Sequence, residues 1–271
     1  LNALTAMALI EKHQDTYANT PASQNFLSKR GQHYLGYMIG HHHQLVESWN
    51  RLGEAVRGGR PVRSRASSDE TWRENFLMGM FNNAMFLAPR IVAKIDLEGR
   101  RRFLDLGGGP GTYAIHFCRR YPQLHAVVYD LPTTRPFAKK TIDRFGLSDR
   151  IRFQAGNFLE DDPGRDFDVA WLSHILHGEG PEDCRRIVAK AAGALQPGGL
   201  LLIHEFILDN DMAHPLFPAL FSLNMLLGTE QGQSYSEAQL REMIAAAGGR
   251  DIRRIHIDTP NESGILAAVI P

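Results

Sequence analysis

The first hundred residues of the chain show mainly one pattern of apolar and polar positions. Apolar side chains recur there at the three- and four-residue spacing of amphipathic helices. We predict helices over 4–13, 41–56 and 67–95, the last beginning with Ser and Asp caps and interrupted before Pro89. Residues 15–21 predict a short extended wing that leads into another helix.

The start of that next helix is marked by a Thr-Pro pair. Thr20 is a good N-cap residue and Pro21 suits the first helical position, where no backbone N–H is needed. A loop rich in Gly, Pro, Ser and Arg over 58–69 suggests a boundary. We therefore expect a first region over 1–66 and a second over 67–271, with 67–98 as connecting helices.

From about residue 100, short apolar runs alternate with helical patterns, which predicts a mostly parallel sheet built through helical crossovers. The link over 258–263 is too short for a crossover, so the last strand should run antiparallel. The predicted strands cover 102–106, 125–131, 151–156, 168–173, 200–207, 252–257 and 264–270.

Composition narrows the class of protein without naming a function. The 271 residues are 43% apolar and 22% charged, which excludes a disordered chain. The net charge is zero, although 1–66 carries eight Lys and Arg against four Asp and Glu residues. Cys118 and Cys184 cannot form a disulfide framework, so we expect a cytoplasmic protein with reduced thiols. No apolar run approaches the roughly 18 residues of a membrane span, and the start at Leu1 suggests missing upstream sequence.

A glycine-rich turn joins the first predicted strand to a helix, with Asp105 preceding Gly107, Gly109 and Gly111. Glycines allow positive φ and let a ligand approach the backbone, while the helix start offers free N–H groups. The spacing does not meet the dinucleotide pattern G-x-G-x-x-G, because Thr112 stands where the third glycine belongs. An NAD-dependent dehydrogenase is therefore a weaker alternative.

The next two strands also end in residues suited to a nucleoside. Asp130 ends the second strand and can bind both ribose hydroxyls. Asn157 and Phe158 follow the third strand, where an amide and a ring could hold the edge and face of an adenine. Ligands of such sheets bind beyond the carboxyl ends of the strands.

The segments LDLGGGPGTYAI, YDLP, GNF, ILH and QPGGLLLIHEFIL, together with FNNAM and LNMLL, resemble the plant-type and acetylserotonin O-methyltransferase-like family across essentially the whole chain. The resemblance implies a Rossmann-like catalytic domain with a seven-stranded sheet, preceded by a partial winged-helix-like dimerisation domain. It also implies S-adenosylmethionine as cofactor and S-adenosylhomocysteine as product. The expected cofactor-binding residues are Asp105, Gly107, Gly109, Gly111, Asp130, Leu131, Asn157, Phe158 and Ser173.

The segment SHILHGEGPED follows the fourth strand and carries the candidate base. A hydroxyl must lose its proton as it attacks a sulfonium methyl, and histidine titrates near working pH. By resemblance, His177 is the general base and Glu205 the carboxylate that orients it. His204 should point to the opposite face of its strand from Glu205 and serve packing.

Four positions depart from the family pattern. Gly178 replaces the usual Asp after the base, and His174 replaces a Lys or Arg. Ser234 replaces a second acidic residue, which leaves the catalytic pair without it, and Asn157 replaces an Asp near the adenine.

Two helical segments rich in Met and Phe, 80–86 and 221–227, resemble the family's acceptor site, although ordinary core packing is the competing interpretation. Asn83 and Asn224 look buried, and a buried amide needs partners. No metal is expected, because consecutive residues such as His41, His42 and His43 point about 100° apart on a helix. The expected acceptor-binding residues are Met80, Asn83, His174, Asn224 and Met225.

The leading hypothesis is thus an O-methyltransferase for an aromatic or polyketide-like hydroxyl, working as a cytoplasmic homodimer without nucleic-acid or membrane partners. A same-fold enzyme that methylates carbon or nitrogen, or does not transfer methyl, is an alternative. An alternative of another class is a winged-helix DNA-binding regulator, suggested by the basic first region. That region's basic residues gather over 51–65 rather than on a recognition helix.

Overall fold

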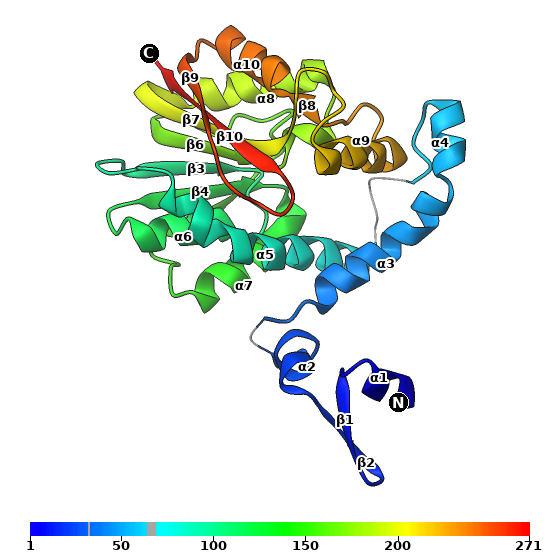
Figure 1. Ribbon diagram of the computed structural model, residues 1–271. Helices are drawn as coiled ribbons and strands as arrows, with labels where there is room; N and C mark the ends of the chain where they lie inside the picture. Colours follow the sequence, from blue (N-terminus) through cyan, green and yellow to red (C-terminus); the bar gives the residue numbers. More distant parts are fainter. Residues whose placement is uncertain (32, 64–68) are drawn as a thin grey trace. The chain divides into compact units, whose positions relative to one another are not determined.

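The computed structural model describes residues 1–31, 33–63 and 69–271, and these fall into two compact units (Figure 1). The first unit comprises residues 1–46 and 67–83, and the second comprises 47–66 and 84–271. The predicted boundary at 66/67 lies outside the described residues, as do the Ser residues predicted to cap the helix that follows it.

The first unit is mainly helical and carries one antiparallel hairpin. Thr20 caps its second helix as predicted, because the Thr20 side chain accepts a hydrogen bond from the Ser23 N–H and Pro21 follows in the first position. Its elements are α1 (Asn2–Ala6), β1 (Ile10–His13), β2 (Thr16–Asn19), α2 (Pro21–Phe26), most of α3 (Gly36–Asn50) and the first part of α5 (Glu70–Ala93).

Two helix predictions in this region were wrong. The segment 4–13 is not one helix: Ala8 takes a φ of 55° and turns the chain, so that 10–13 pairs as β1 with the extended segment predicted over 15–21. The segment 41–56 is divided at Arg51 between α3 and α4 (Leu52–Gly58). In both places a turn, at Ala8 and at Arg51, interrupts the helix. The spacing of apolar residues does not reveal such turns, so tertiary structure overrides helix propensity there.

Helix α5 continues through Pro89 instead of being interrupted before it. Asp69 caps its start, because the Thr71 and Trp72 N–H groups donate to Asp69 Oδ1 at 2.8 and 3.3 Å. By length and composition alone α5 could cross a membrane, although no unbroken apolar run in the sequence is that long. Core helices meet the same criterion.

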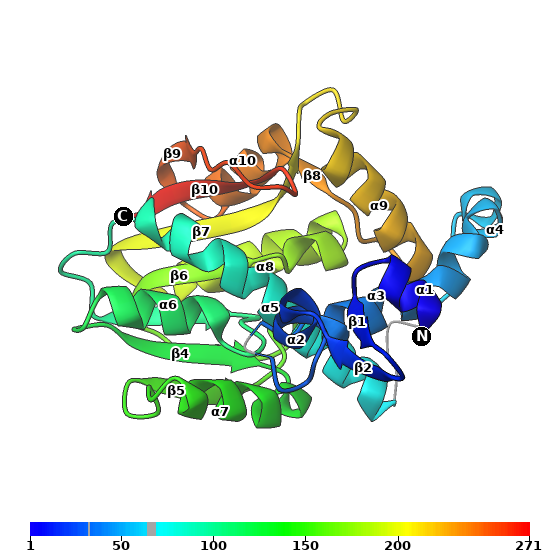
Figure 2. The same ribbon diagram turned by 60° about the horizontal axis from the view of Figure 1, so that its bottom comes forward.

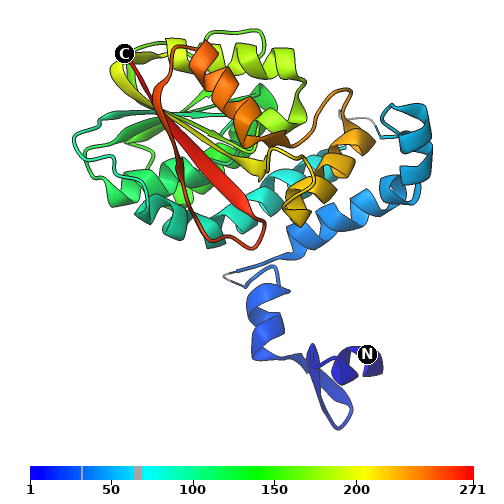
Figure 3. The same cartoon turned by 45° about the horizontal axis from the view of Figure 1, so that its top comes forward.

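The second unit holds the large sheet, in the order β5-β4-β3-β6-β7-β10-β9, with the short β8 beside β7. Figure 2 shows β5 and β9 at its two edges, and Figure 3 shows β10, in red, running along β7. The strands are β3 (Arg102–Leu106), β4 (His125–Asp130), β5 (Ile151–Ala155), β6 (Phe167–Ser173), β7 (Leu195–Leu208), β8 (Tyr235–Ser236), β9 (Arg250–Ile255) and β10 (Ser263–Ile270).

Strands β3 to β7 pair in parallel, and β10 runs antiparallel to both β7 and β9, as predicted. Leu106 of β3 lies opposite Tyr129 of β4 and Leu172 of β6, and Ser173 lies opposite His204 of β7. This register brings the carboxyl ends of β4, β3, β6 and β7 to one edge of the sheet, where the predicted site residues lie.

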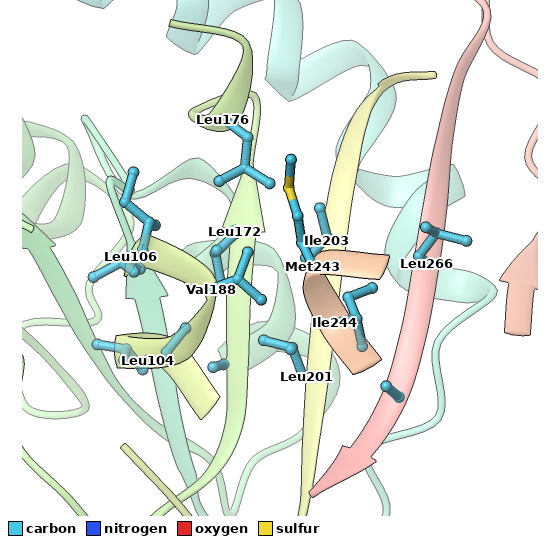
Figure 4. Packing of buried hydrophobic residues seen from close by; sticks show 14 of the residues in the cluster. Leu104, Leu106, Leu172, Leu176, Val188, Leu201, Ile203, Met243, Ile244 and Leu266 are labelled. Atoms are coloured by element: carbon cyan, nitrogen blue, oxygen red, sulfur yellow. The ribbon is translucent and has the colours of Figure 1, made fainter. Parts of the chain in front are cut away.

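Helices cover both faces of this sheet (Figure 1). On one face, Leu104, Leu106, Leu172 and Leu201 pack against residues of α8 and α10 (Figure 4). These leucines are at most 1% exposed, so each contributes about 1.5–3 kcal/mol through burial. The remaining helices are α6 (Thr112–Arg120), η1 (Pro132–Thr134), α7 (Arg135–Arg144), η2 (Leu176–Gly178), α8 (Pro181–Gly193), α9 (Leu216–Gly228) and α10 (Glu237–Ala246).

The other face packs against α6 through aromatic rings. Phe103 of β3 lies 4.9 Å from Phe117, and Trp171 of β6 lies 4.9 Å from Tyr113, measured between ring centroids. Side chains alternate along each strand, so Asp105 faces α6 with Phe103. The alternation of side chains along the strands thereby determines which site residues face α6 and which face α8.

Candidate active site

The turn between β3 and α6 is built from glycines in conformations that other residues avoid. Gly107, Gly109 and Gly111 have φ values of 66°, 55° and 81°. A Cβ at Gly107 would lie 2.6 Å from Cγ2 of Ile175, and one at Gly111 would lie 3.2 Å from Val128. A Cβ at Gly109 would meet nothing within 4 Å. Two of these glycines therefore permit packing, while Gly109 leaves open space beside the turn.

Asp130 closes this turn from the end of β4. Its Oδ2 accepts the Gly109 N–H at 2.8 Å, and its Oδ1 accepts the Leu131 N–H at 2.7 Å and the Thr134 hydroxyl at 3.0 Å. Burial raises the pKa of Asp130, and these hydrogen bonds oppose that rise. An ionised carboxylate can accept about four hydrogen bonds, two on each oxygen. Oδ1 already accepts two and Oδ2 accepts one, so Oδ2 can accept one more.

Asp105 lies beneath the same turn and is only 1% exposed. Its Oδ2 accepts the Ala114 N–H at 3.2 Å. Burial raises its pKa to about 7, against the effect of that hydrogen bond. Asp105 therefore supports the turn from inside the fold rather than from an open surface.

These groups fit the nucleoside of S-adenosylmethionine. The open space at Gly109 admits a ligand to the backbone, and the remaining acceptor position of Asp130 suits a ribose hydroxyl. The start of α6 directly follows the turn and adds free N–H groups.

Asn157 and Phe158 follow β5, beside the end of β4. The Asn157 Oδ1 accepts the Leu159 N–H at 3.1 Å, so the amide that was expected to face an adenine also caps its own turn. Phe158 is partly buried and packs against the cluster under α8 and α10. Leu131, at the end of β4, is 46% exposed.

His177 lies in η2, beyond the carboxyl end of β6, and pairs with Glu205 of β7. The His177 Nδ1 and Glu205 Oε2 atoms are 2.8 Å apart. Glu205 also accepts backbone N–H groups, at Oε1 from Leu176 (2.8 Å) and His177 (3.3 Å), and at Oε2 from Phe206 (3.2 Å). Because Ile175 packs against Gly107, the histidine loop and the glycine turn are direct neighbours.

Glu205 is held as a carboxylate. Burial by itself raises its pKa, but attraction to His177, the hydrogen bond with His177 and the nearby His174 outweigh burial and bring the pKa well below its ordinary value. An ionised carboxylate only accepts hydrogen bonds, so the His177 Nδ1 carries the proton that lies between them. In the neutral imidazole, Nε2 is then the nitrogen that can accept a proton.

His174 lies beside this pair in a left-handed backbone conformation, with a φ of 56°. Its Nδ1 is 3.6 Å from Glu205 Oε2, and burial lowers its pKa. The donor atoms of His174, His177 and Glu205 lie within 4.8 Å of one another, a grouping that could also hold a metal ion. This group was not foreseen, because the sequence drew attention to the histidines at 41–43. His41, by contrast, is buried against Trp72 within the first unit.

His204 points to the opposite face from Glu205, as predicted, but it does more than fill space. Its Nδ1 lies 3.0 Å from Ser173 Oγ, and its Nε2 lies 3.0 Å from Ser263 Oγ. Burial, and then the charge of His174, bring its pKa well below the ordinary value. His204 is therefore a neutral imidazole that ties Ser173 to β10.

The expected acceptor residues are divided between the two units. In the second, Met225 is buried, and Asn224 Oδ1 is buried without a hydrogen-bond partner among the described residues. In the first, Asn83 is exposed rather than buried, and its amide lies 3.9 Å from the Met38 sulfur. Helical periodicity had placed Asn83 inward, but α5 turns that side chain outward. Met80 is half-buried.

Two aromatic residues beside His177 were not singled out from the sequence, although Phe221 begins the predicted acceptor segment 221–227. The ring centroids of Phe206 and Phe221 lie 5.6 and 4.8 Å from that of His177. Phe206 adjoins Glu205, and Phe221 lies one helical turn before Asn224. The signal in the sequence was the position of Phe206 beside Glu205 and of Phe221 within the segment 221–227, and it was weak because Phe is common in ordinary cores.

Comparison with known proteins places this site in a family. The profile of the O-methyltransferase domain matches residues 49–250. The 3-hydroxy-5-methyl-1-naphthoate 3-O-methyltransferase of Streptomyces sahachiroi is 33% identical, over 99% of this chain and 80% of its own. The tetracenomycin polyketide synthesis 8-O-methyl transferase of Streptomyces glaucescens is 32% identical, over 98% and 80%.

A solved structure agrees with these relatives. Human N-acetylserotonin methyltransferase in complex with S-adenosylmethionine superimposes with a TM-score of 0.81 at 25% identity, covering 99% of this chain and 81% of that one. The regulator and dehydrogenase alternatives find no support in these matches. The chain therefore belongs to the S-adenosylmethionine-dependent O-methyltransferase family and is a methyltransferase.

Proposed function

We propose that the protein methylates a hydroxyl of an aromatic or polyketide-like small molecule, with His177 as general base. The observation that carries this proposal is the 2.8 Å pair between His177 Nδ1 and Glu205 Oε2, adjacent to the glycine turn. It leaves Nε2 free to accept the proton of a hydroxyl. The relatives' names support the acceptor class, since they include a hydroxynaphthoate and a polyketide product.

The chain's own residues then perform three tasks. The glycine turn and Asp130 bind the nucleoside, with Asp105, Leu131, Asn157, Phe158 and Ser173 as further proposed cofactor residues. When bound, S-adenosylmethionine supplies an electrophilic methyl group on its sulfonium. Glu205 fixes the imidazole and stabilises the charge that His177 gains. Phe206 and Phe221 place an aromatic ring beside the base, with Met225 as a further proposed acceptor residue, and this positioning supplies much of the acceleration.

The test is His177→Gln in the full chain, assayed by transfer of labelled methyl from S-adenosylmethionine to a panel of hydroxylated aromatics in the presence of a chelator. Loss of the base should lower turnover about 10²- to 10⁴-fold and leave the cofactor Kd unchanged. The exposed His256→Gln serves as control. Undiminished turnover in His177→Gln would refute the assignment, and inhibition of the wild type by the chelator would refute metal independence. Mass analysis of the product separates methylation at oxygen from methylation at nitrogen or carbon.

We also propose a homodimer, formed through the winged-helix-like first region, with 1–66 as dimerisation region and 67–271 as catalytic domain. Within the first unit, α3 exposes Ile39 (56%) and Val46 (52%) one heptad apart, an apolar stripe that pairing would cover. Sedimentation analysis tests the dimer. The buried free thiols of Cys118 and Cys184 suit a reduced cytoplasm, which cell fractionation tests.

A further inference from the structure

Arg63 is a half-buried cation in the second unit, held against the end of α9. The N–H groups of Val62 and Arg63 both donate to the Leu227 carbonyl, at 3.1 and 3.0 Å. A Cβ on Gly228 would overlap the Arg63 guanidinium, so the glycine makes room for it. The backbone thus fixes Arg63 on α9, and Gly228 provides the space for its head group.

Within the part of the chain that the structure describes, no carboxylate neutralises the guanidinium. Its Nη1 is buried without a hydrogen-bond partner, and no carboxylate pairs with Arg63 among residues 1–31, 33–63 and 69–271. The segment 64–68 contains no acidic residue that could supply one. A buried guanidinium without a counter-charge is unfavourable, and carboxylates match its fork of N–H donors.

One face of α9 leads from this cation to the base. Phe221 touches the His177 ring, Asn224 and Met225 follow one turn later, and Gly228 touches Arg63. Residues seven positions apart lie on the same face, and seven residues span about 10 Å. Between the two ends lies the unpartnered Oδ1 of Asn224.

We propose that Arg63 binds a carboxylate on the aromatic acceptor, at the opposite end of this α9 face, which spans about 10 Å, from the hydroxyl that His177 deprotonates. This inference rests on the proposed function and narrows it to aromatic hydroxy acids. The span suits a fused two-ring system that carries the hydroxyl at one end and the carboxylate at the other. Asn224 Oδ1, between them, accepts a hydrogen bond from a donor on the ring.

The test compares three acceptors that differ in the group offered to Arg63: a hydroxynaphthoic acid with a charged carboxylate, its primary carboxamide with a neutral group of similar size, and the parent naphthol with neither. In the wild type, kcat/KM for the acid should exceed that for the carboxamide by about 10- to 100-fold, as expected of a charge-assisted pair. Arg63→Met should reduce this ratio to near one, mainly through KM, and leave the naphthol and the cofactor Kd unchanged. Arg63→Lys, which keeps the charge, should retain part of the preference.

Arg60→Met is the matched control, because Arg60 is exposed three residues away and should leave the ratio intact. Equal use of acid and carboxamide by the wild type would overturn the proposal, as would an equal loss for all three acceptors or a weakened cofactor Kd in Arg63→Met. If none of the three is methylated, the proposed function fails for this class. Calorimetric binding of acid and carboxamide to the enzyme loaded with S-adenosylhomocysteine then still tests Arg63 by itself.

Discussion

Replacing Glu205 with Gln tests whether the catalytic histidine depends on a carboxylate or only on a side chain of the right size. Each Glu205 oxygen accepts two N–H donors: Oε1 from Leu176 and His177 backbones, and Oε2 from His177 Nδ1 and the Phe206 backbone. Glutamine has one carbonyl oxygen and one NH₂ group. In either orientation, that NH₂ faces two donors.

The size of the effect follows from this mismatch. An unsatisfied buried donor costs about 1–3 kcal/mol. The free energy of unfolding therefore falls by about 2–6 kcal/mol when two donors are left, and by about 1–3 kcal/mol when the His177 tautomer changes and leaves only the Phe206 N–H unsatisfied. If the NH₂ faces Nδ1, the His177 proton moves to Nε2 and the base can no longer accept. If it faces Leu176, His177 keeps its tautomer but loses the carboxylate that stabilises its charged form. We expect turnover to fall by about 10²- to 10⁴-fold.

Urea unfolding and methyl transfer at saturating cofactor measure the two effects on the same Glu205→Gln protein. The exposed Glu98→Gln is the control, since it makes the same chemical change before β3, at the opposite edge of the sheet from the base. The S-adenosylmethionine Kd should stay within about threefold of wild type. Wild-type turnover in a folded Glu205→Gln protein would refute the role of the carboxylate.

Two further predictions concern the glycine turn. Burial raises the pKa of Asp105 from 3.8 to about 7, so its contribution to stability is present below the unfolded pKa and is lost as pH rises through 7, by up to about 4 kcal/mol. Asp105→Asn should therefore raise the free energy of unfolding relative to wild type at pH 8, and this advantage should shrink towards pH 5; a constant difference in urea unfolding would contradict it. Gly109→Ala and Gly146→Ala place a Cβ in open space at φ 55° and 65°, so each should lose about 1 kcal/mol of stability. Only Gly109→Ala should weaken S-adenosylmethionine binding by calorimetry, and equal affinities would contradict the assignment of the turn.

Local sequence patterns determined the catalytic half of the fold. Alternating apolar runs predicted β3 over 102–106 with the bounds that the structure has, and the short link after β9 predicted an antiparallel β10. The family resemblance suggested the His177–Glu205 pair, and the parallel pairing of β6 with β7 brings the two residues to one edge of the sheet. Such inferences succeed because strand period and crossover handedness are local or nearly universal constraints.

Only the tertiary structure decided which side chains those elements leave without partners. Sequence suggested that Asn83 was buried and gave no reason to notice Arg63, yet Asn83 is exposed and Arg63 is held against Gly228 by backbone contacts to Leu227. The hairpin at β1–β2 likewise depends on a left-handed Ala8 that helical spacing conceals. Burial and charge pairing arise from contacts between segments far apart in the chain. The spacing of apolar residues within one segment therefore cannot predict them.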